Sequence, residues 1–174
     1  SNLGLALAQA HKKVVIVDSD LRKPRQDKIF ELDFNWGLSH FLSSIVDATE
    51  VILPTPYANL FLVPAGNAQI PPLEALLSDK MKAFITFLRQ QYDYVLLDSP
   101  PLLAISDALV LSKMVDSLIL VVRAGQTPIS ALKQVKAKLD AHHLNCLGVI
   151  INEVNLVEQE GYYSRQYYHY SKPL

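Results

Sequence analysis

The chain has 174 residues, 50% of them hydrophobic, and this length and composition predict one domain with an ample core. Its 16 Lys and Arg nearly balance 17 Asp and Glu, so the formal net charge is −1. The near-zero charge provides no general basic field, so nucleic acid is excluded as an expected partner. No apolar stretch approaches the roughly 20 residues that cross a bilayer and no secretory leader is present, so we expect a cytoplasmic location.

The first predicted element is a helix over Ser1–His11, SNLGLALAQAH. Leu3, Leu7 and Ala10 fall on one helical face, and several small residues allow close packing. Neither an apolar strand nor a phosphate-binding turn precedes it in this sequence. The stretch therefore has the pattern of a helix body without the loop that binds nucleotide phosphates in many ATPases.

The most informative stretch is Val14–Pro24, VVIVDSDLRKP. Four consecutive apolar residues predict a strand covered on both faces, as in a parallel sheet, because a half-exposed strand would alternate. Asp18 and Asp20 follow at the carboxyl end of the strand, where open α/β sheets bind ligands. Carboxylates there suit a hydrated Mg²⁺, and from spacing alone a solvated acidic turn is an equal alternative.

Two short helices are expected after this strand, over Arg25–Phe34 and Gly37–Val46. The second has apolar positions at helical spacing. His40 lies beside those positions, and we interpret it as a surface residue rather than a ligand.

A weak strand over Val51–Pro56 and a stronger one over Leu60–Val63 come next, and a loop then runs to Pro72. Ser78 is predicted to cap a further helix. The buried face of that helix is expected to contain Met81, Phe84, Ile85 and Leu88.

Tyr94–Leu97 is predicted as another buried strand, and Asp98 ends it. A lone Asp at a strand end is commonly structural, but Asp18 and Asp98 at the ends of two parallel strands can converge on one ion. Asp107 opens a helix that runs to about Lys113. We interpret Asp107 as a cap or a packing charge in preference to a catalytic residue.

The remaining pattern contains a core strand over Ser117–Val122, a helix that begins at Thr127 and Pro128, and a last strand over Leu147–Ile151. Asn152 stands at the carboxyl end of that last strand. The sheet-facing positions of the helix are expected to be Ile129, Leu132, Val135 and Leu139, and its lysines, Lys133, Lys136 and Lys138, are expected to be solvated.

Strand and helix patterns thus alternate, which predicts a three-layer α/β domain with a mostly parallel sheet and right-handed crossovers. The single cysteine, Cys146, lies in the apolar run LNCLGVII and is predicted to be a buried, inert thiol. It cannot form an internal disulfide, which fits a reducing cytoplasm.

The C-terminal segment differs in composition. Five of the eight tyrosines fall between Gly161 and Tyr170, with neither period 2 nor period 3.6. A mobile tail is accessible to another molecule's active site, where a phenol can be phosphorylated in line with the γ-phosphate. The alternatives are an aromatic patch that packs on a neighbouring subunit and a strip that stacks on RNA.

Four stretches resemble motifs of the bacterial tyrosine kinases that control capsule and exopolysaccharide synthesis. VVIVDSDLRKP is similar to their second Walker-type motif, Walker A-prime, and YDYVLLDSPP at 92–101 to their Walker B strand. LFLVPAG at 60–66 resembles the strand and turn before Walker B, and GYYSRQYYHY at 161–170 resembles their tyrosine cluster. Walker A-prime alone is shared with deviant-Walker ATPases that position division sites and segregate plasmids.

The resemblance implies a three-layer α/β/α fold of the P-loop NTPase type, deviant-Walker and similar to the division-site ATPase MinD. The family's first strand and its Gly-Lys-Ser/Thr loop are not among these residues, so we expect an N-terminally truncated sequence that is inactive alone. Residues 1–155 would form the partial kinase domain and residues 156–174 a flexible tyrosine-rich tail.

The resemblance also implies phosphoryl transfer from ATP to tyrosine with Mg²⁺. Asp18 is the candidate to orient or accept the phenol proton and to fix a Mg²⁺ water, and Asp20 and Asp98 are carried over as ligands of the metal, direct or through water. Arg22 could bind phosphate or form a salt bridge across the loop, and Asn152 could contact the adenine base. The implied phosphoacceptors are Tyr162, Tyr163, Tyr167, Tyr168 and Tyr170.

For the complete protein the resemblance implies a homo-oligomer, a fused or separate membrane activator of the chain-length or copolymerase type, and a tyrosine phosphatase. The location would be the inner face of the plasma membrane. Two other classes stay open: a deviant-Walker ATPase that acts as a nucleotide-dependent positioning switch, and a non-catalytic binding module of a polysaccharide assembly complex.

Overall fold

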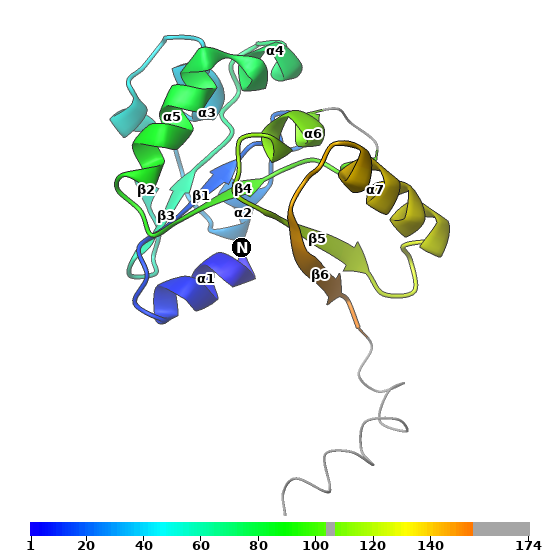
Figure 1. The fold of residues 1–174 in the computed structure, drawn as a ribbon. Coiled ribbons are helices and arrows are strands. Elements are labelled where there is room, and N and C mark those ends of the chain that lie inside the picture. The colour runs from blue at the N-terminus through cyan, green and yellow to red at the C-terminus, as the bar shows by residue number, and fades with distance from the viewer. Residues whose placement is uncertain (104–106, 155–174) are drawn as a thin grey trace, which may run out of the picture. The chain divides into compact units, whose positions relative to one another are not determined.

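The computed structural model describes residues 1–103 and 107–154 (Figure 1). The chain divides into two compact units, Ser1–Val115 and Asp116–Leu174, and each is described by itself. The expected start of the tail at residue 156 and the whole tyrosine cluster lie outside the described residues.

The first unit is built on a four-stranded sheet with the order β2-β3-β1-β4. The inner strand β1 (Val14–Asp18) runs parallel to both β3 (Leu60–Val63) and β4 (Tyr94–Asp98), whereas the short β2 (Leu53–Pro54) runs antiparallel to β3. All five residues of β1 are buried. The prediction of a strand covered on both faces is confirmed.

Alternate residues of β1 belong to two separate cores. Val15 and Val17 pack in a cluster with residues of α3 (Leu38–Leu42) and α5 (Asp79–Arg89). Val14 and Ile16 pack in a second cluster, which includes a residue of α1 (Asn2–Gln9) and Phe30, the residue directly after α2 (Gln26–Ile29). Figure 1 shows α5 and α1 on opposite sides of this sheet, so the first unit has three layers.

The start of α5 agrees with the prediction. The Ser78 hydroxyl accepts a hydrogen bond from the Met81 backbone N–H at 3.1 Å, which caps the helix. The predicted inner face of this helix is buried, and it consists of Met81, Phe84, Ile85 and Leu88.

Three further elements complete the first unit. The helix α6 (Asp107–Ser112) begins at the predicted residue. The helix α4 (Pro72–Leu77) was not predicted, although Pro72 occupies its first position as proline commonly does. A 3₁₀ turn, Ala48–Val51, precedes the short β2 and takes the beginning of the strand that was expected over Val51–Pro56.

The interpretation of His40 as a surface residue is wrong. Its side chain is buried, and Nδ1 accepts a hydrogen bond from the Gly37 backbone N–H at 3.1 Å. The ring also lies edge-on to Trp36, with 5.2 Å between the ring centroids. The first N–H groups of a helix lack partners within it, and the imidazole supplies an acceptor at the start of α3.

The second unit contains β5 (Leu118–Arg123), α7 (Ile129–Ala141) and β6 (Cys146–Asn152), and its two strands are parallel. The helix begins at Ile129, one residue later than predicted, because Pro128 is extended and precedes the helix as its N-cap. Val135 and Leu139 are buried, but Ile129 is 73% exposed, so its assignment to the inner face is wrong. Ile129 is the first residue of α7, and the buried residues of this helix lie further along it.

The prediction that Cys146 is buried is also too strong, because this first residue of β6 is only half-buried.

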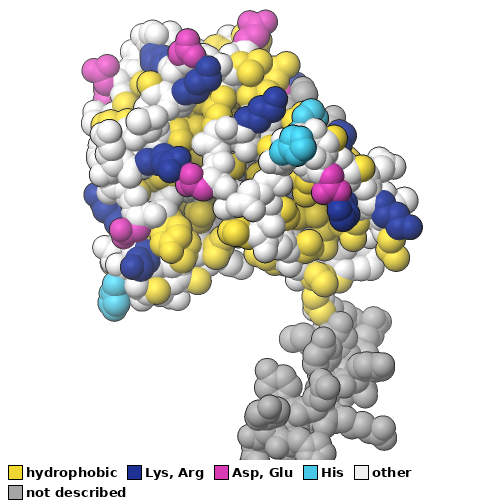
Figure 2. Space-filling model, in the orientation of Figure 1, with side chains coloured by type: hydrophobic (Ala, Val, Ile, Leu, Met, Phe, Trp, Pro, Cys, Tyr) yellow, Lys and Arg dark blue, Asp and Glu magenta, His cyan; other side chains and the backbone are white. Residues whose placement is uncertain are grey.

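The three lysines of α7 are exposed, as predicted. On the face drawn in Figure 2, Lys and Arg side chains are interspersed with Asp and Glu, so neither sign dominates there. Within residues 1–103 and 107–154, no helix combines the length and the apolar character needed to cross a membrane.

Candidate active site

Two carboxylates meet where the neighbouring strands β1 and β4 end. Asp18 and Asp98 are register partners in the parallel pair, so their backbones lie side by side. The backbone N–H of Ser19 donates to the Asp98 carbonyl oxygen at 2.8 Å and extends the pairing by one residue. Asp18 is 1% exposed, whereas Asp98 is exposed. The register places the two acids side by side at one edge of the sheet, as expected, and their convergence on one ion stays a prediction.

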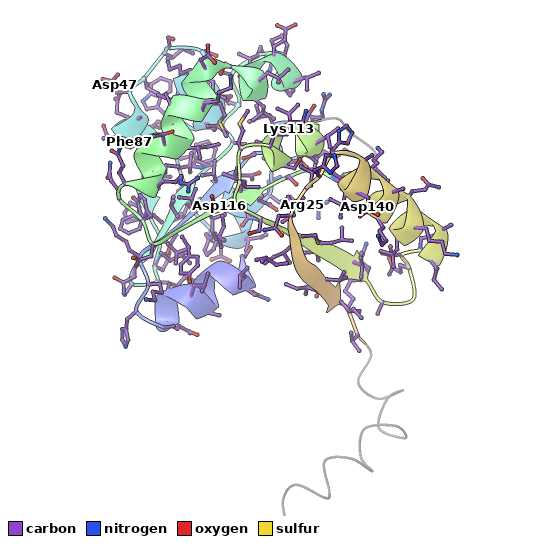
Figure 3. All side chains as sticks on the ribbon, in the orientation of Figure 1. Arg25, Asp47, Phe87, Lys113, Asp116 and Asp140 are labelled. Atoms are coloured by element: carbon purple, nitrogen blue, oxygen red, sulfur yellow. The ribbon has the colours of Figure 1, made fainter. Side chains whose placement is uncertain are left out.

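The Asp18 carboxylate is held by backbone N–H groups. Oδ1 accepts from the N–H of Asp20 at 3.3 Å, and Oδ2 accepts from the N–H groups of Arg25 and Gln26, each at 3.0 Å. Arg25, labelled in Figure 3, is the N-cap residue directly before α2. Burial raises the pKa of the Asp18 carboxyl, and the charge of Asp98 adds to that rise, while these backbone hydrogen bonds oppose it.

The carboxylate of Asp20 folds back on its own loop. Its Oδ1 accepts hydrogen bonds from the backbone N–H groups of Arg22 at 3.1 Å and Lys23 at 3.0 Å. This arrangement fixes the turn that follows β1. Asp20 therefore shapes the loop, and a single carboxylate oxygen accepts both of these hydrogen bonds.

Arg22 forms a salt bridge across the loop, one of the two roles considered for it from the sequence. Its Nε donates to Asp107 Oδ2 at 2.8 Å and its Nη2 donates to Asp107 Oδ1 at 3.4 Å. The Asp107 side chain is 2% exposed and that of Arg22 is 42% exposed. The interpretation of Asp107 as a packing charge is confirmed, and the buried acid is matched by a cation.

Gln26 is a member of the site that sequence reasoning missed. Its Nε2 donates to Asp98 Oδ2 at 2.6 Å, and its Oε1 accepts from the Ser1 hydroxyl at 2.8 Å. The side chain is 5% exposed. No local pattern marks a glutamine at the start of a four-residue helix, since its role depends on a partner 72 residues away in the sequence.

The donor set fits a hydrated Mg²⁺. Two adjacent carboxylates, one buried and one exposed, supply hard oxygen ligands, and Mg²⁺ usually binds through one or two carboxylates together with waters and substrate phosphates. The described residues contain no cluster of three or more His, Cys, Asp or Glu side chains that could enclose a metal by themselves.

The other predicted site residues belong to the second unit or fall outside the described residues. Asn152 ends β6 in the second unit and is exposed, and its carbonyl oxygen accepts the backbone N–H of Ala124 at 2.9 Å. Beside it, Arg123 pairs with Glu153 at 2.7 Å. The five candidate phosphoacceptors, Tyr162, Tyr163, Tyr167, Tyr168 and Tyr170, lie outside the described residues.

Comparisons with known proteins identify the family. The family described as AAA domain matches residues 1–147. CapB of Staphylococcus aureus, named as a tyrosine-protein kinase, is 31% identical over 163 residues, which are 94% of this chain and 72% of CapB. The chain belongs to the bacterial tyrosine kinases. Another member, tyrosine-protein kinase wzc of Salmonella typhi, is 29% identical over 98% of this chain but only 24% of its own length. The chain thus spans about a quarter of that kinase.

Solved kinase structures share the fold. The kinase domain of VpsO is 34% identical with a TM-score of 0.83, and the alignment covers 88% of this chain and 76% of VpsO. The chimerical protein CapA2B2 is 32% identical with a TM-score of 0.84, and the alignment covers 88% of this chain and 68% of CapA2B2. The septum site-determining protein MinD of Pyrococcus horikoshii, complexed with Mg-ADP, is 26% identical with a TM-score of 0.69. That alignment covers 86% of this chain and 61% of MinD. The predicted α/β fold of the P-loop NTPase type is confirmed, and the kinases are the nearer group.

Proposed function

We propose that this chain is most of the catalytic domain of a protein-tyrosine autokinase that regulates capsular or exopolysaccharide synthesis and export. The observation that carries the proposal is the pairing of Asp18 with Asp98 at the ends of adjacent parallel strands, in a chain whose relatives are named tyrosine-protein kinases. The tyrosine cluster supplies acceptors within the same chain.

The reaction transfers the γ-phosphoryl group of ATP to a tyrosine oxygen. The bond between the γ-phosphorus and the bridging oxygen of ADP breaks as the bond to the phenol oxygen forms, and the phenol proton leaves. A phenol has a pKa near 10, so it needs help to lose that proton. Asp18 would orient or accept it.

Mg²⁺ would offset the charge that develops on the phosphates. Asp18 and Asp98 would hold this ion, directly or through water, and Asp20 would take part through water. Arg22 would hold the loop that carries these acids, through its bond to Asp107. Asn152 would contact the adenine base.

The 174 residues contain no Gly-Lys-Ser/Thr loop, whose backbone amides and Lys supply much of the attraction for phosphates. By themselves they would bind Mg-ATP weakly and would not be active. Micromolar binding of Mg-ATP to residues 1–174 by calorimetry would contradict this expectation.

The complete kinase would assemble as a homo-oligomer at the inner face of the plasma membrane. It would be activated by a membrane protein of the chain-length or copolymerase type, fused or separate, and reset by a tyrosine phosphatase. The similarity to the chimerical protein CapA2B2 and to the much longer wzc supports further segments or partners.

The test compares Asp18→Asn and Asp98→Asn in the full-length protein. Each substitution should lower Mg²⁺-dependent phosphate incorporation into tyrosine by orders of magnitude. For Asp18, the candidate base, the range that general acid–base catalysis contributes is about 10²–10⁴-fold. Asp79→Asn is the matched control, because Asp79 is an exposed acid that pairs with Lys82 on α5. Wild-type incorporation by either variant would remove the two acids from the mechanism. ATP hydrolysis without tyrosine phosphorylation by the wild type would instead favour the positioning ATPase.

A further inference from the structure

Gln26 connects three parts of the first unit with one side chain and one backbone group. Its amide nitrogen donates to Asp98 at the end of β4, its amide oxygen accepts from Ser1 at the start of α1, and its backbone N–H donates to Asp18 at the end of β1. It is therefore the one described residue that donates hydrogen bonds to both carboxylates of the pair.

The chemistry of the amide group suits this place. Two adjacent carboxylates repel each other, and a Lys or Arg between them would neutralise the charge that a divalent cation needs. A neutral amide donates a hydrogen bond and orients the carboxylate without removing that charge. The 2.6 Å distance from Gln26 Nε2 to Asp98 Oδ2 is that of a direct hydrogen bond.

The contact with Ser1 fixes which way the amide points. A carboxylate only accepts, so the nitrogen faces Asp98 and the oxygen is left for the Ser1 hydroxyl, which donates at 2.8 Å. The Ser1 hydroxyl thus acts on the orientation of the amide.

We propose that Gln26 is a positioning residue, which holds the exposed Asp98 carboxylate beside the buried Asp18 so that the pair can bind a divalent cation together with a nucleotide. This inference rests on the proposed function. Partners that orient metal ligands in this way typically change metal affinity by about 10–100-fold when they are removed.

The experiment uses the full-length protein and Mn²⁺ as a paramagnetic probe. Gln26→Met keeps the length of the side chain and removes its donor, and Ser1→Ala removes only the anchor. Lys28→Met is the matched control, because Lys28 is an exposed residue of the same short helix. Three quantities are measured: Mn²⁺ affinity in the presence of ADP by electron paramagnetic resonance, ADP affinity in EDTA by calorimetry, and Tm.

We expect Gln26→Met to lower the Mn²⁺ affinity about tenfold or more, while ADP affinity in EDTA changes less than about twofold. Ser1→Ala should lower the Mn²⁺ affinity by a smaller factor, and Lys28→Met should match the wild type. Equal Mn²⁺ affinity in the wild type and Gln26→Met would overturn the positioning role. Equal losses of Mn²⁺ affinity and of ADP affinity in EDTA would also overturn it. A fall in Tm large enough to explain both losses by unfolding would do the same. Failure of the wild type itself to bind Mn²⁺ with ADP would instead refute the proposed metal site.

Discussion

Asp18 combines two opposing influences on its charge. Its side chain is almost fully buried and lies beside the carboxylate of Asp98, and both conditions disfavour ionisation. Three backbone N–H groups, from Asp20, Arg25 and Gln26, favour ionisation. Burial prevails, so the pKa is raised in the folded protein. A group tuned in this way contributes to function at a cost to stability.

This balance predicts that Asp18→Asn stabilises the protein in EDTA at neutral pH. An amide oxygen still accepts from Arg25 and Gln26 at 3.0 Å, and only the longer bond from Asp20, at 3.3 Å, is lost. Because the folded pKa is raised, wild-type Asp18 carries no penalty below its unfolded pKa of about 3.9, and the penalty grows as pH rises through the folded pKa. The Tm of the variant should exceed that of the wild type by a few degrees at pH 7, since 1 kcal/mol shifts Tm by about 2–4 °C in a chain of this size.

The pH series supplies the control for this prediction. The difference in Tm between Asp18→Asn and the wild type should shrink as pH falls toward 4, because the wild-type carboxyl then becomes protonated. A variant that melts several degrees below the wild type at every pH would show that the backbone hydrogen bonds outweigh burial.

Single residues of the site were predictable to different degrees. Asp18 and Asp98 could be found because each directly follows an apolar run, and parallel strands end at the same edge of a sheet. Gln26 could not be found, since its partners lie 25 and 72 residues away and a glutamine follows no local rule. His40 was misplaced for a related reason. Its burial follows from the turn at Gly37, which no periodicity reveals.

At the scale of elements, the pair of Arg22 and Asp107 ties the loop after β1 to the first turn of α6. We predict that Arg22→Met lowers Tm more than Asp107→Asn does. The first change leaves a buried carboxylate without its cation, whereas the second leaves an exposed Arg in solvent. Thermal melts of both variants and of the double variant test this. The double variant should melt close to Asp107→Asn, and strictly additive losses would show that the two side chains do not act as a pair.

The start of α3 depends on a glycine that packs against backbone. A Cβ at Gly37 would lie 2.5 Å from the Pro64 carbonyl oxygen and even closer to the Gly66 backbone nitrogen. Gly37→Ala should therefore destabilise the protein by about 1–3 kcal/mol, as overpacking does, because backbone atoms cannot yield as a side chain can. Gly148→Ala in β6 is the control, since a Cβ there meets no atom within 4 Å. Urea unfolding that gives equal midpoints for the two variants would contradict the prediction.

The elements themselves were predictable where the pattern was long and periodic. The strand β1 matches its prediction because a short apolar run rich in β-branched residues favours a buried strand. The helix α5 matches because apolar residues with a 3.6-residue period indicate a helix. The six-residue α4 was missed because it lies among prolines, which usually mark loops. Ile129 was assigned to an inner face because the apolar period of α7 begins one turn before packing does.

At the scale of the whole molecule, alternating strands and helices correctly predicted a mostly parallel α/β fold. Every strand pair among the described residues is parallel except that of β2 with β3. The division into a four-stranded and a two-stranded sheet was not predicted. Periodicity indicates which residues form strands, but strand partners depend on the complete set of strands that compete for each edge.

The proposed autokinase activity has a consequence for assembly. Each phosphotyrosine adds about −1.5 to −2 charge near neutral pH, so several modified tyrosines would load a short segment with like charges. A tail bound in a neighbour's active site would then face Asp18 and Asp98, which carry the same sign. Such a tail should be repelled, and we hypothesise that the oligomer of the complete kinase dissociates as the tyrosines fill and re-forms when a phosphatase resets them.

The corresponding prediction concerns a full-length variant in which the five clustered tyrosines are replaced by phenylalanine, at Tyr162, Tyr163, Tyr167, Tyr168 and Tyr170. Phenylalanine keeps the aromatic ring but cannot accept phosphate, so this variant should stay oligomeric in Mg-ATP while the wild type falls to monomers in light scattering. One modified tyrosine would give a smaller charge step, so variants that retain a single tyrosine should dissociate only partly. If the wild type and the five-fold variant dissociated alike on addition of Mg-ATP, nucleotide binding rather than the charge of the tail would control assembly.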